Sequence, residues 1–177
     1  MRNEGPFIVE WVTWYRMLGF SDVVVVTNNC TDRSPELLDA LQAAGWVHHL
    51  RHDVAPGQRI THQKLAAATQ HKAVRRADWA LVCDVDEFLV IHEGTGRIEE
   101  LIGTRTTDVP FLAMGFNWRI FGSCGVEAFQ DEPVHQQFAL ALPLKGSGSS
   151  MMKMMHRQPR WFQSLGEHGP RGWDLAR

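Results

Sequence analysis

The sequence predicts an α/β fold with a mostly parallel sheet flanked by helices. Helical and strand-like segments alternate through the first half of the chain, beginning with apolar residues at helical spacing over residues 7–18. Residues 22–27 then form a run that is apolar on both faces, and residues 80–90 form a second apolar run that three carboxylates interrupt. Such runs are typical of parallel strands that helices cover on both sides.

Local signals support each element of this pattern. Pro6 suits the first turn of the helix over residues 7–18, and Gly19 suits its C-terminal end. Ser34 is a suitable N-cap for a second helix over residues 34–44. Further along, the same reasoning predicts strands at residues 46–50, 109–121 and 138–144, helices at residues 61–77 and 97–102, and loop or weak strand over residues 151–177.

Composition narrows the class of protein. The 177 residues suffice for one domain with a substantial core, and 44% hydrophobic and 21% charged residues are ordinary for a globular protein. The net charge of −2 argues against a general nucleic-acid binder. No apolar run approaches the roughly 18–20 residues of a transmembrane helix, and Glu4 and Glu10 interrupt the order of a signal peptide. Cys30, Cys83 and Cys124 are far apart, which favours free thiols in a reducing cytoplasm.

Three carboxylates follow the apolar residues 80–83. Asp84, Asp86 and Glu87 lie within four positions, and burying three acids together is costly unless a positive charge lies among them. A divalent cation with oxygen ligands would supply that charge, and it could bridge two phosphates and neutralise a departing diphosphate. A helix N-cap with acids solvated at the end of a strand fits the same spacing. The spacing alone leaves both interpretations open.

A second polar loop, at residues 27–34, follows the first predicted strand. In open α/β sheets, ligands bind outside the carboxyl ends of the strands. We therefore expect this loop and residues 84–87 to contribute to one site. His48 and His49 would point to opposite faces of a strand, which favours solvated histidines over a second metal site.

Five short motifs are spread along the chain. The first is Arg-Asn-Glu-Gly at residues 2–5, and the second is a Val-rich strand followed by Asn-Asn-Cys-Thr-Asp at residues 24–32. The third, at residues 78–88, is Asp-Trp followed by a strand and then by Asp-Val-Asp-Glu-Phe. The last two are Trp-Arg-Ile-Phe-Gly at residues 118–122 and Gly-Glu-His-Gly-Pro-Arg at residues 166–171. In this order they resemble the signatures of bacterial family-2-like glycosyltransferases. The third is similar to the metal-binding core of that family, and together the five cover nearly the whole chain.

The resemblance implies a GT-A fold, in which a Rossmann-like sheet binds a nucleotide-sugar together with Mn²⁺ or Mg²⁺. It implies a single domain over residues 1–177, with a half for a UDP- or GDP-sugar at about residues 1–92 and an acceptor half at about 93–177. Asp84 and Asp86 would hold the metal, and His168 would approach the metal or the diphosphate. Without the resemblance, His168 would be read as a surface histidine on a turn rich in Gly and Pro.

The resemblance also implies a set of residues around the nucleotide. Thr27 stands where many relatives carry an acid. Lys153 and Arg157 match basic residues of relatives and could pair with phosphate, although surface charge explains them equally well. The full expected set is Asn3, Glu4, Thr27, Asn28, Asp32, Lys153 and Arg157.

A polar loop at residues 126–137 carries candidates for the catalytic base. Transfer with inversion, which the family analogy favours, requires a base for the acceptor hydroxyl. Glu127, Asp131 and Glu132 could supply it, although for any one of them a solvated acidic loop is the more ordinary explanation.

The resemblance also shows departures from the family pattern. Relatives usually have an apolar strand before the Arg-Asn-Glu motif, whereas this chain starts at Met1. We therefore expect a GT-A fold that lacks its usual first strand, either because the reading frame starts late or because the chain is truncated. The first hypothesis is a metal-dependent glycosyltransferase acting on a saccharide or other hydroxyl acceptor. The alternative is a truncated or degenerate domain that binds nucleotide or a partner without catalysis. A nucleotidyltransferase is disfavoured because it usually carries a Gly-rich phosphate loop near its N-terminus.

Overall fold

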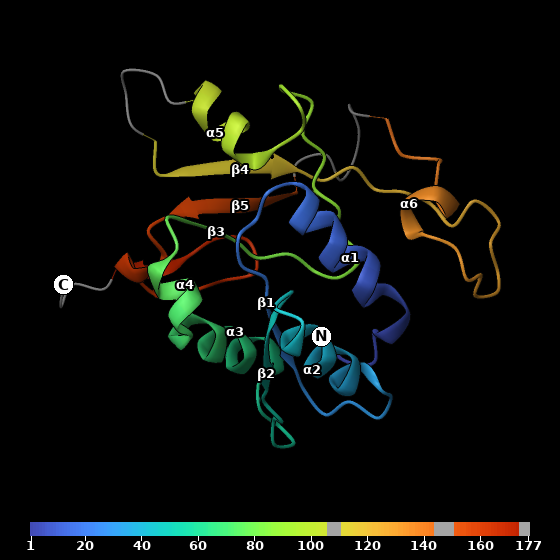
Figure 1. Ribbon diagram of the computed structural model, residues 1–177, viewed down its shortest axis with the longest axis horizontal. Coiled ribbons are helices and arrows are strands. Elements are labelled where there is room, and N and C mark those ends of the chain that lie inside the picture. Colours follow the sequence, from blue (N-terminus) through green and yellow to red (C-terminus); the bar gives the residue numbers. More distant parts are fainter. Residues whose placement is uncertain (106–110, 144–150, 174–177) are drawn as a thin grey trace.

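The computed structural model describes residues 1–105, 111–143 and 151–173 (Figure 1). It has a mixed α/β fold with three small sheets. The helices are α1 (Gly5–Met17), α2 (Ser34–Ala43), α3 (Ile60–Gln70), α4 (Lys72–Arg76), α5 (Ile98–Arg105), α6 (Val134–Gln137) and the 3-10 helix η1 (Pro159–Trp161). The strands are β1 (Val24–Thr27), β2 (His48–Arg51), β3 (Trp79–Leu81), β4 (Ala113–Asn117), β5 (Met152–Arg157), β6 (Phe162–Ser164) and β7 (Arg171–Trp173).

The parallel pair of β1 and β2 follows the predicted pattern. The register begins with Val24 opposite His48, α2 contacts both strands, and α3 contacts β1. Val25 belongs to one buried hydrophobic cluster and Val26 to another. Because successive residues of a strand point to opposite faces, β1 is covered on both sides, as its apolar sequence predicts.

The second sheet corrects the predicted architecture. β5 lies between β3 and β4 and pairs antiparallel with both, and β6 and β7 form a further antiparallel pair. The expectation of a large, mostly parallel Rossmann-like sheet is therefore wrong, since among the described residues only β1 and β2 pair in parallel. The prediction failed because the central strand β5 lies in a region expected to be loop or weak strand. This strand buries the polar Lys153 and His156 beside Met155. Its sequence consequently lacks the alternation that identifies a half-buried strand.

Two predicted elements are shorter or broken. The helix expected at residues 61–77 divides into α3 and α4 at His71, whose extended backbone (ψ 137°) ends one helix while its ring nitrogen accepts from the N–H of Ala73. The strand expected at the apolar residues 80–83 ends at Leu81. The chain then turns, with the N–H of Glu87 donating to the carbonyl of Asp84. The carboxylates therefore lie on a turn that follows the strand.

The second half contains less strand than expected. β4 occupies only Ala113–Asn117 of the segment at residues 109–121, of which residues 109 and 110 lie outside the described part. The strand expected at residues 138–144 is reduced to one bridge between Phe121 and Ala141, and residue 144 also lies outside the described part. The helix expected at residues 97–102 is present as α5.

The main hydrophobic core packs α1 against strands of two sheets. Ile8 and Val12 of α1 lie in one buried cluster with Val25 of β1 and Met155 of β5. Helix α1 therefore packs against both the parallel pair and the antiparallel sheet and lies beside them (Figure 1). No helix in the described ranges is both long and apolar enough to cross a membrane.

Candidate functional site

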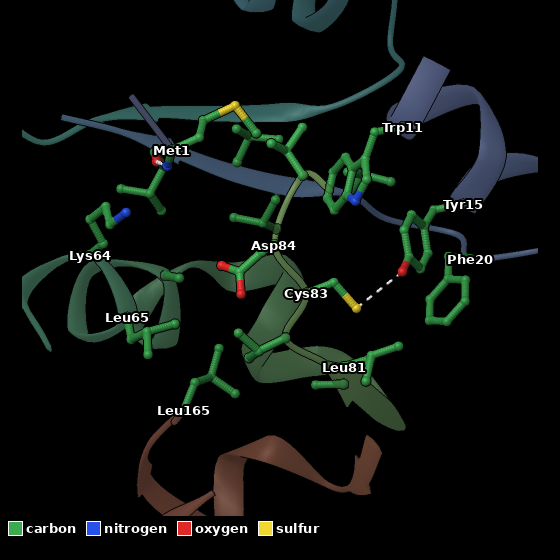
Figure 2. Close-up of a pocket in the computed structure, with 18 of the residues that line it drawn as sticks. Met1, Trp11, Tyr15, Phe20, Lys64, Leu65, Leu81, Cys83, Asp84 and Leu165 are labelled. Atoms are coloured by element: carbon green, nitrogen blue, oxygen red, sulfur yellow. Dashed lines mark hydrogen bonds between the residues drawn. The ribbon is translucent and has the colours of Figure 1, made fainter. Parts of the chain in front are cut away.

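A cavity of about 750 Å³ lies between β1 and β3 (Figure 2). Strand residues 23–26 and 80–82 form its walls, with Trp11 and Tyr15 of α1 and Leu65 of α3 also lining it. Its charged lining comes from Arg2, Glu4, Asp22, Lys64, Asp84, Asp86 and Glu167. The cavity thus joins an apolar interior to a group of charges at the ends of the two strands.

Lys153 forms the electrostatic centre of the turn at residues 84–87. Its ammonium lies 2.9 Å from Oδ2 of Asp84 and 3.3 Å from Oε2 of Glu87. The side chain of Lys153 is only 6% exposed, whereas that of Asp84 is 67% exposed. Burial acts to lower the pKa of Lys153, but the hydrogen bond to Asp84 and the charge of Glu87 outweigh it and raise that pKa. The turn is therefore organised around a buried cation that the chain itself supplies.

Glu87 supports the turn from inside. Its carboxylate accepts the backbone N–H of Asp84 at 3.0 Å, in addition to its ion pair with Lys153. Burial raises the pKa of Glu87, in opposition to these two contacts. Glu87 therefore holds the turn in place through both its backbone contact and its ion pair.

Tyr15 fastens this turn to α1. Its hydroxyl lies 3.1 Å from Sγ of Cys83 and 3.1 Å from the carbonyl oxygen of Glu87. Burial raises the pKa of the Cys83 thiol to about 12, so this thiol stays protonated near neutral pH. Cys83 is consequently a structural residue. The three cysteines, all of which lie in the described ranges, are free.

Lys153 and His168, from the C-terminal part of the chain, both lie close to the ring of Trp118. The ammonium of Lys153 lies 5.7 Å from the centre of the Trp118 ring, which is a cation–π distance. The ring centre of His168 lies 6.0 Å from that of Trp118, and its Nδ1 is 3.1 Å from the carbonyl oxygen of Met152. Lys153 and His168 therefore both lie near one indole ring, and Lys153 also contacts Asp84.

Asp86 lies on the side of the turn that faces the N-terminal residues. Burial raises the pKa of Glu4, and the negative charge of Asp86 contributes to the same shift. The described residues contain no group of three His, Cys, Asp or Glu side chains placed to hold a metal ion. Mg²⁺ commonly binds through one or two carboxylates, substrate phosphates and water. The exposed carboxylate of Asp84, together with Asp86, fits that donor set.

Asn3 and Asp32 hold two loops together beside this cluster. Asn3 donates to the hydroxyl of Thr31 at 2.9 Å and accepts the N–H of Thr31 at 2.8 Å. Asp32 accepts the hydroxyl of Ser34 at 2.6 Å and the N–H of Gly5 at 3.4 Å. The Ser34 hydrogen bond lowers the pKa of Asp32. The structure thus brings both predicted nucleotide residues together, with their side chains engaged in loop contacts.

Thr27 and Asn28, at the end of β1, are both buried and lie outside the lining of the cavity. The Thr27 hydroxyl is 2.8 Å from Nε2 of His49, and Nδ1 of His49 is 2.6 Å from Asp39 of α2. Thr27 is therefore turned toward α2. Asn28 is only 2% exposed, and its side-chain oxygen has no hydrogen-bond partner in the described part of the chain.

The remaining predicted site residues are not drawn into the cluster. Arg157 is exposed at the far end of β5, opposite Trp79. Glu127, Asp131 and Glu132 are exposed on their loop. The end of that loop is nevertheless anchored near the cavity, because Val134 and Phe138 line it.

The sequence pattern of glycosyltransferase family 92 matches residues 3–139. The chain belongs to glycosyltransferase family 92. No curated protein and no solved structure matches the chain. The expectation of a glycosyltransferase is therefore confirmed, whereas the narrower family-2-like assignment is not supported. Membership of family 92 implies a sugar donor and an acceptor as partners.

The family 92 match includes Asp84, Asp86 and Glu87 of the turn and the loop at residues 126–137. It ends before β5 and before His168, so Lys153 enters the site from outside the matched residues. Sequence reasoning missed Lys64, Tyr15 and the buried His49 in this family 92 protein. Lys64 reads as an ordinary helix-surface lysine, and His49 was expected to be solvated, because neither position carries a local signal of burial. Only the pairing of β1 with β2 reveals that His49 faces Thr27.

Proposed function

We propose that this family 92 protein transfers a sugar from a UDP- or GDP-sugar to a hydroxyl group of an acceptor, with inversion at the anomeric carbon. The family match over residues 3–139 carries this proposal. The charged group at the ends of β1 and β3 supports the position of the donor, because ligands of α/β folds bind at the carboxyl ends of strands. That group includes Asp84, Asp86 and Lys64.

We place a Mn²⁺ or Mg²⁺ ion at Asp84 and Asp86. When bound, such an ion neutralises charge on the departing diphosphate. The chain supplies two further cations to the same region: Lys64 lines the cavity, and Lys153 contacts Asp84. A diphosphate next to Asp84 would therefore meet positive charge from the protein as well as from the ion.

The acceptor would approach from the loop at residues 126–137. One carboxylate of Glu127, Asp131 or Glu132 takes the proton of the acceptor hydroxyl. The hydroxyl oxygen then forms the new bond to the anomeric carbon while the bond from that carbon to the diphosphate breaks, and the diphosphate leaves with the electron pair. These three side chains are exposed and therefore accessible to a large acceptor.

Donor hydrolysis tests this function. Purified protein is incubated with UDP- and GDP-sugars and Mn²⁺, and released nucleoside diphosphate is measured for wild type, Asp86→Ala and the control Glu36→Gln on the exposed part of α2. We expect Asp86→Ala to lower the rate at least about 100-fold, because loss of one charge-stabilising contact costs about 3 kcal/mol in the transition state. The control should retain the wild-type rate.

Equal rates in wild type and Asp86→Ala would contradict the role of Asp86. Nucleotide binding in a thermal-shift assay without turnover of any donor would instead favour the non-catalytic alternative.

A further inference from the structure

Basic side chains gather at the end of the molecule that α4, η1 and the last residue of β5 form. Helices α4 and η1 contact each other there, and Figure 1 shows α4 beside the red segment that follows β5. The group, which we name the basic face, consists of Lys72, Arg75 and Arg76 of α4, Arg157 of β5 and Arg160 of η1.

Helix α4 directs its charged side away from the interior. Ala73 and Val74 line the cavity between β1 and β3, whereas no residue of the basic face lines it. Residues three and four positions apart share one side of a helix. Lys72, Arg75 and Arg76 therefore lie together on the side of α4 that points away from the cavity, where Lys72 and Arg76 are exposed and Arg75 is half-buried.

Gln158 holds the end of β5 and η1 against the residues that follow α4. Its N–H donates to the carbonyl of Asp78 at 2.7 Å, and its side-chain amide donates to Oδ1 of Asp78 at 3.1 Å. Its left-handed backbone (φ 49°) turns the chain from β5 into η1. Arg157 and Arg160, on either side of this turn, are both exposed. The fold thus brings two distant segments of the chain into one basic face.

Little negative charge balances the basic face. Between Asp53 and Asp84 the sequence contains one acid, Asp78, and between Glu132 and Glu167 it contains none. Within the described ranges, no ion pair involves a residue of the basic face. A chain with a net charge of −2 therefore concentrates positive charge at one end. Such a concentration attracts an anionic partner.

Two exposed apolar side chains lie among these cations. Trp161, next to Arg160, is 37% exposed, and Leu112 is 47% exposed. The carbonyl of Leu112 accepts the N–H of Arg157 at 2.8 Å, so Leu112 lies beside the end of β5. A lipid bilayer accommodates all of these groups, because Trp lies at the level of the headgroups, aliphatic side chains enter the acyl boundary, and Lys and Arg attract anionic lipids. A single-stranded nucleic acid would stack on Trp161 but would leave Leu112 in water.

We propose that the basic face binds the surface of a membrane that contains anionic lipids. Lys72, Arg76 and Arg160 contact the headgroups, and Trp161 and Leu112 enter the interface between headgroups and acyl chains. The binding is peripheral and reversible, because the attraction between exposed charges is screened by salt. This proposal does not depend on sugar transfer.

Sedimentation with lipid vesicles tests the proposal. The full chain is mixed with sucrose-loaded vesicles of phosphatidylcholine, either alone or with about 30% phosphatidylserine, at about 0.1 M and about 0.5 M salt. We expect binding to the anionic vesicles to be about 100-fold tighter than to the neutral ones at the lower salt, since each Lys or Arg near the surface contributes about fivefold. The higher salt should release the protein.

Two variants test whether the basic face carries this binding. Lys72→Gln/Arg76→Gln/Arg160→Gln should bind the anionic vesicles about 100-fold more weakly, because three cations are removed. Arg76→Lys/Arg160→Lys should bind like the wild type, because a charged surface requires the positive charge and not the planar fork of Arg. Arg75 is left in place in both variants because it is half-buried.

The matched control is Arg33→Gln/Arg59→Gln/Arg119→Gln, which removes the same charge from exposed positions elsewhere. It should bind like the wild type. Equal binding of the wild type to neutral and anionic vesicles would overturn the proposal, and so would an equal loss of binding in the two triple variants. Tighter binding of a single-stranded oligonucleotide of about 20 nucleotides than of the anionic vesicles would also overturn it, in favour of a nucleic-acid partner.

Discussion

At the scale of single residues, the ammonium of Lys153 lies beside Asp84, which is one of the two carboxylates proposed to bind the metal ion. The ammonium contacts Asp84 and Glu87 and lies over the ring of Trp118. A divalent cation that binds Asp84 must therefore compete with an internal cation. Removal of one partner from a buried ion pair also leaves the other charge uncompensated. Lys153 should thus lower the affinity of the empty site for metal while it strengthens the attraction for a diphosphate.

Lys153→Met separates these two effects. Without the ammonium, Asp84 is free to bind the ion, so we expect Mn²⁺ to bind roughly tenfold more tightly, which corresponds to about 1.4 kcal/mol. Binding of UDP or GDP in the presence of EDTA should weaken, because a cation near the diphosphate has been lost. Isothermal titration calorimetry measures both affinities.

The control for this change is Lys72→Met, which removes an exposed lysine of α4. It should leave both affinities unchanged. Unaltered Mn²⁺ affinity in a folded Lys153→Met variant would show that Lys153 does not compete with metal.

At the scale of elements, one carboxylate of α1 anchors the short helix α6. Glu10 accepts the backbone N–H of Val134 at 2.8 Å and that of His135 at 3.3 Å, and it lies 2.6 Å from Nδ1 of the His135 ring. The two N–H groups lie at the beginning of α6, where they have no partner within the helix. This anchor positions the end of the acidic loop, from which the acceptor is proposed to approach, beside α1.

The Glu10 anchor should respond to acid. Burial acts to raise the pKa of Glu10, but the hydrogen bonds from His135 and Val134 outweigh it, and the pKa lies below its ordinary value of 4.5. A carboxylate with a lowered pKa contributes stability that is complete above the unfolded pKa and is lost as pH falls through the folded pKa. We expect the Val134 amide resonance, followed by NMR, to be constant from pH 7 to about 5 and to titrate with a midpoint below 4.5.

Glu10→Gln should remove that titration and weaken the docking of α6 by about 1–2 kcal/mol at neutral pH, because hydrogen bonds to a charged acceptor are the stronger ones. Glu99→Gln, on the exposed side of α5, is the matched control. A Val134 midpoint at or above 4.5 in the wild type would contradict the interpretation.

At the scale of the whole molecule, β5 joins the parts of the fold. It is the middle strand of the antiparallel sheet, Met155 is fully buried in the main core, and Lys153 reaches the candidate site from the same strand. Its neighbour His156 is 1% exposed and packs edge-on against Phe162. Neither ring nitrogen of His156 has a hydrogen-bond partner in the described residues. The stability of the molecule therefore depends on keeping this imidazole neutral.

Acidification should destabilise the protein through His156. Burial lowers the pKa of His156 from 6.5 to about 4, so between these values the unfolded chain binds a proton that the native state excludes. This contribution is complete above pH 6.5 and declines as pH falls toward 4, by about 3 kcal/mol in total. Urea unfolding at pH 7 and pH 5 measures it, with an expected loss of about 2 kcal/mol over that interval.

His156→Phe should flatten this dependence, because Phe fills a similar space and does not titrate. The exposed His92→Phe is the control and should keep the wild-type dependence. The assignment to His156 fails if the His156→Phe variant loses the same free energy between pH 7 and pH 5 as the wild type.

The elements with local signals were predictable from the sequence. Pro6 and Gly19 mark the two ends of α1, and Ser34 begins α2. The Val-rich β1 is covered on both faces because its side chains are apolar on both faces. The position of Asp84 and Asp86 after a strand, and the membership of a glycosyltransferase family, also follow from short motifs that do not depend on long-range contacts.

Only the tertiary structure decided how these elements combine. The sequence alone determined that a strand is followed by carboxylates, because that requires nothing but neighbouring residues. Which strand lies beside β3, and in which direction, depends on a segment more than 70 residues away whose inward side chains include a lysine and a histidine. Lys153 can be buried there because Asp84 and Glu87 lie opposite its ammonium. Pairings of this kind are long-range, so no local pattern encodes them, and they placed a lysine beside the predicted metal ligands.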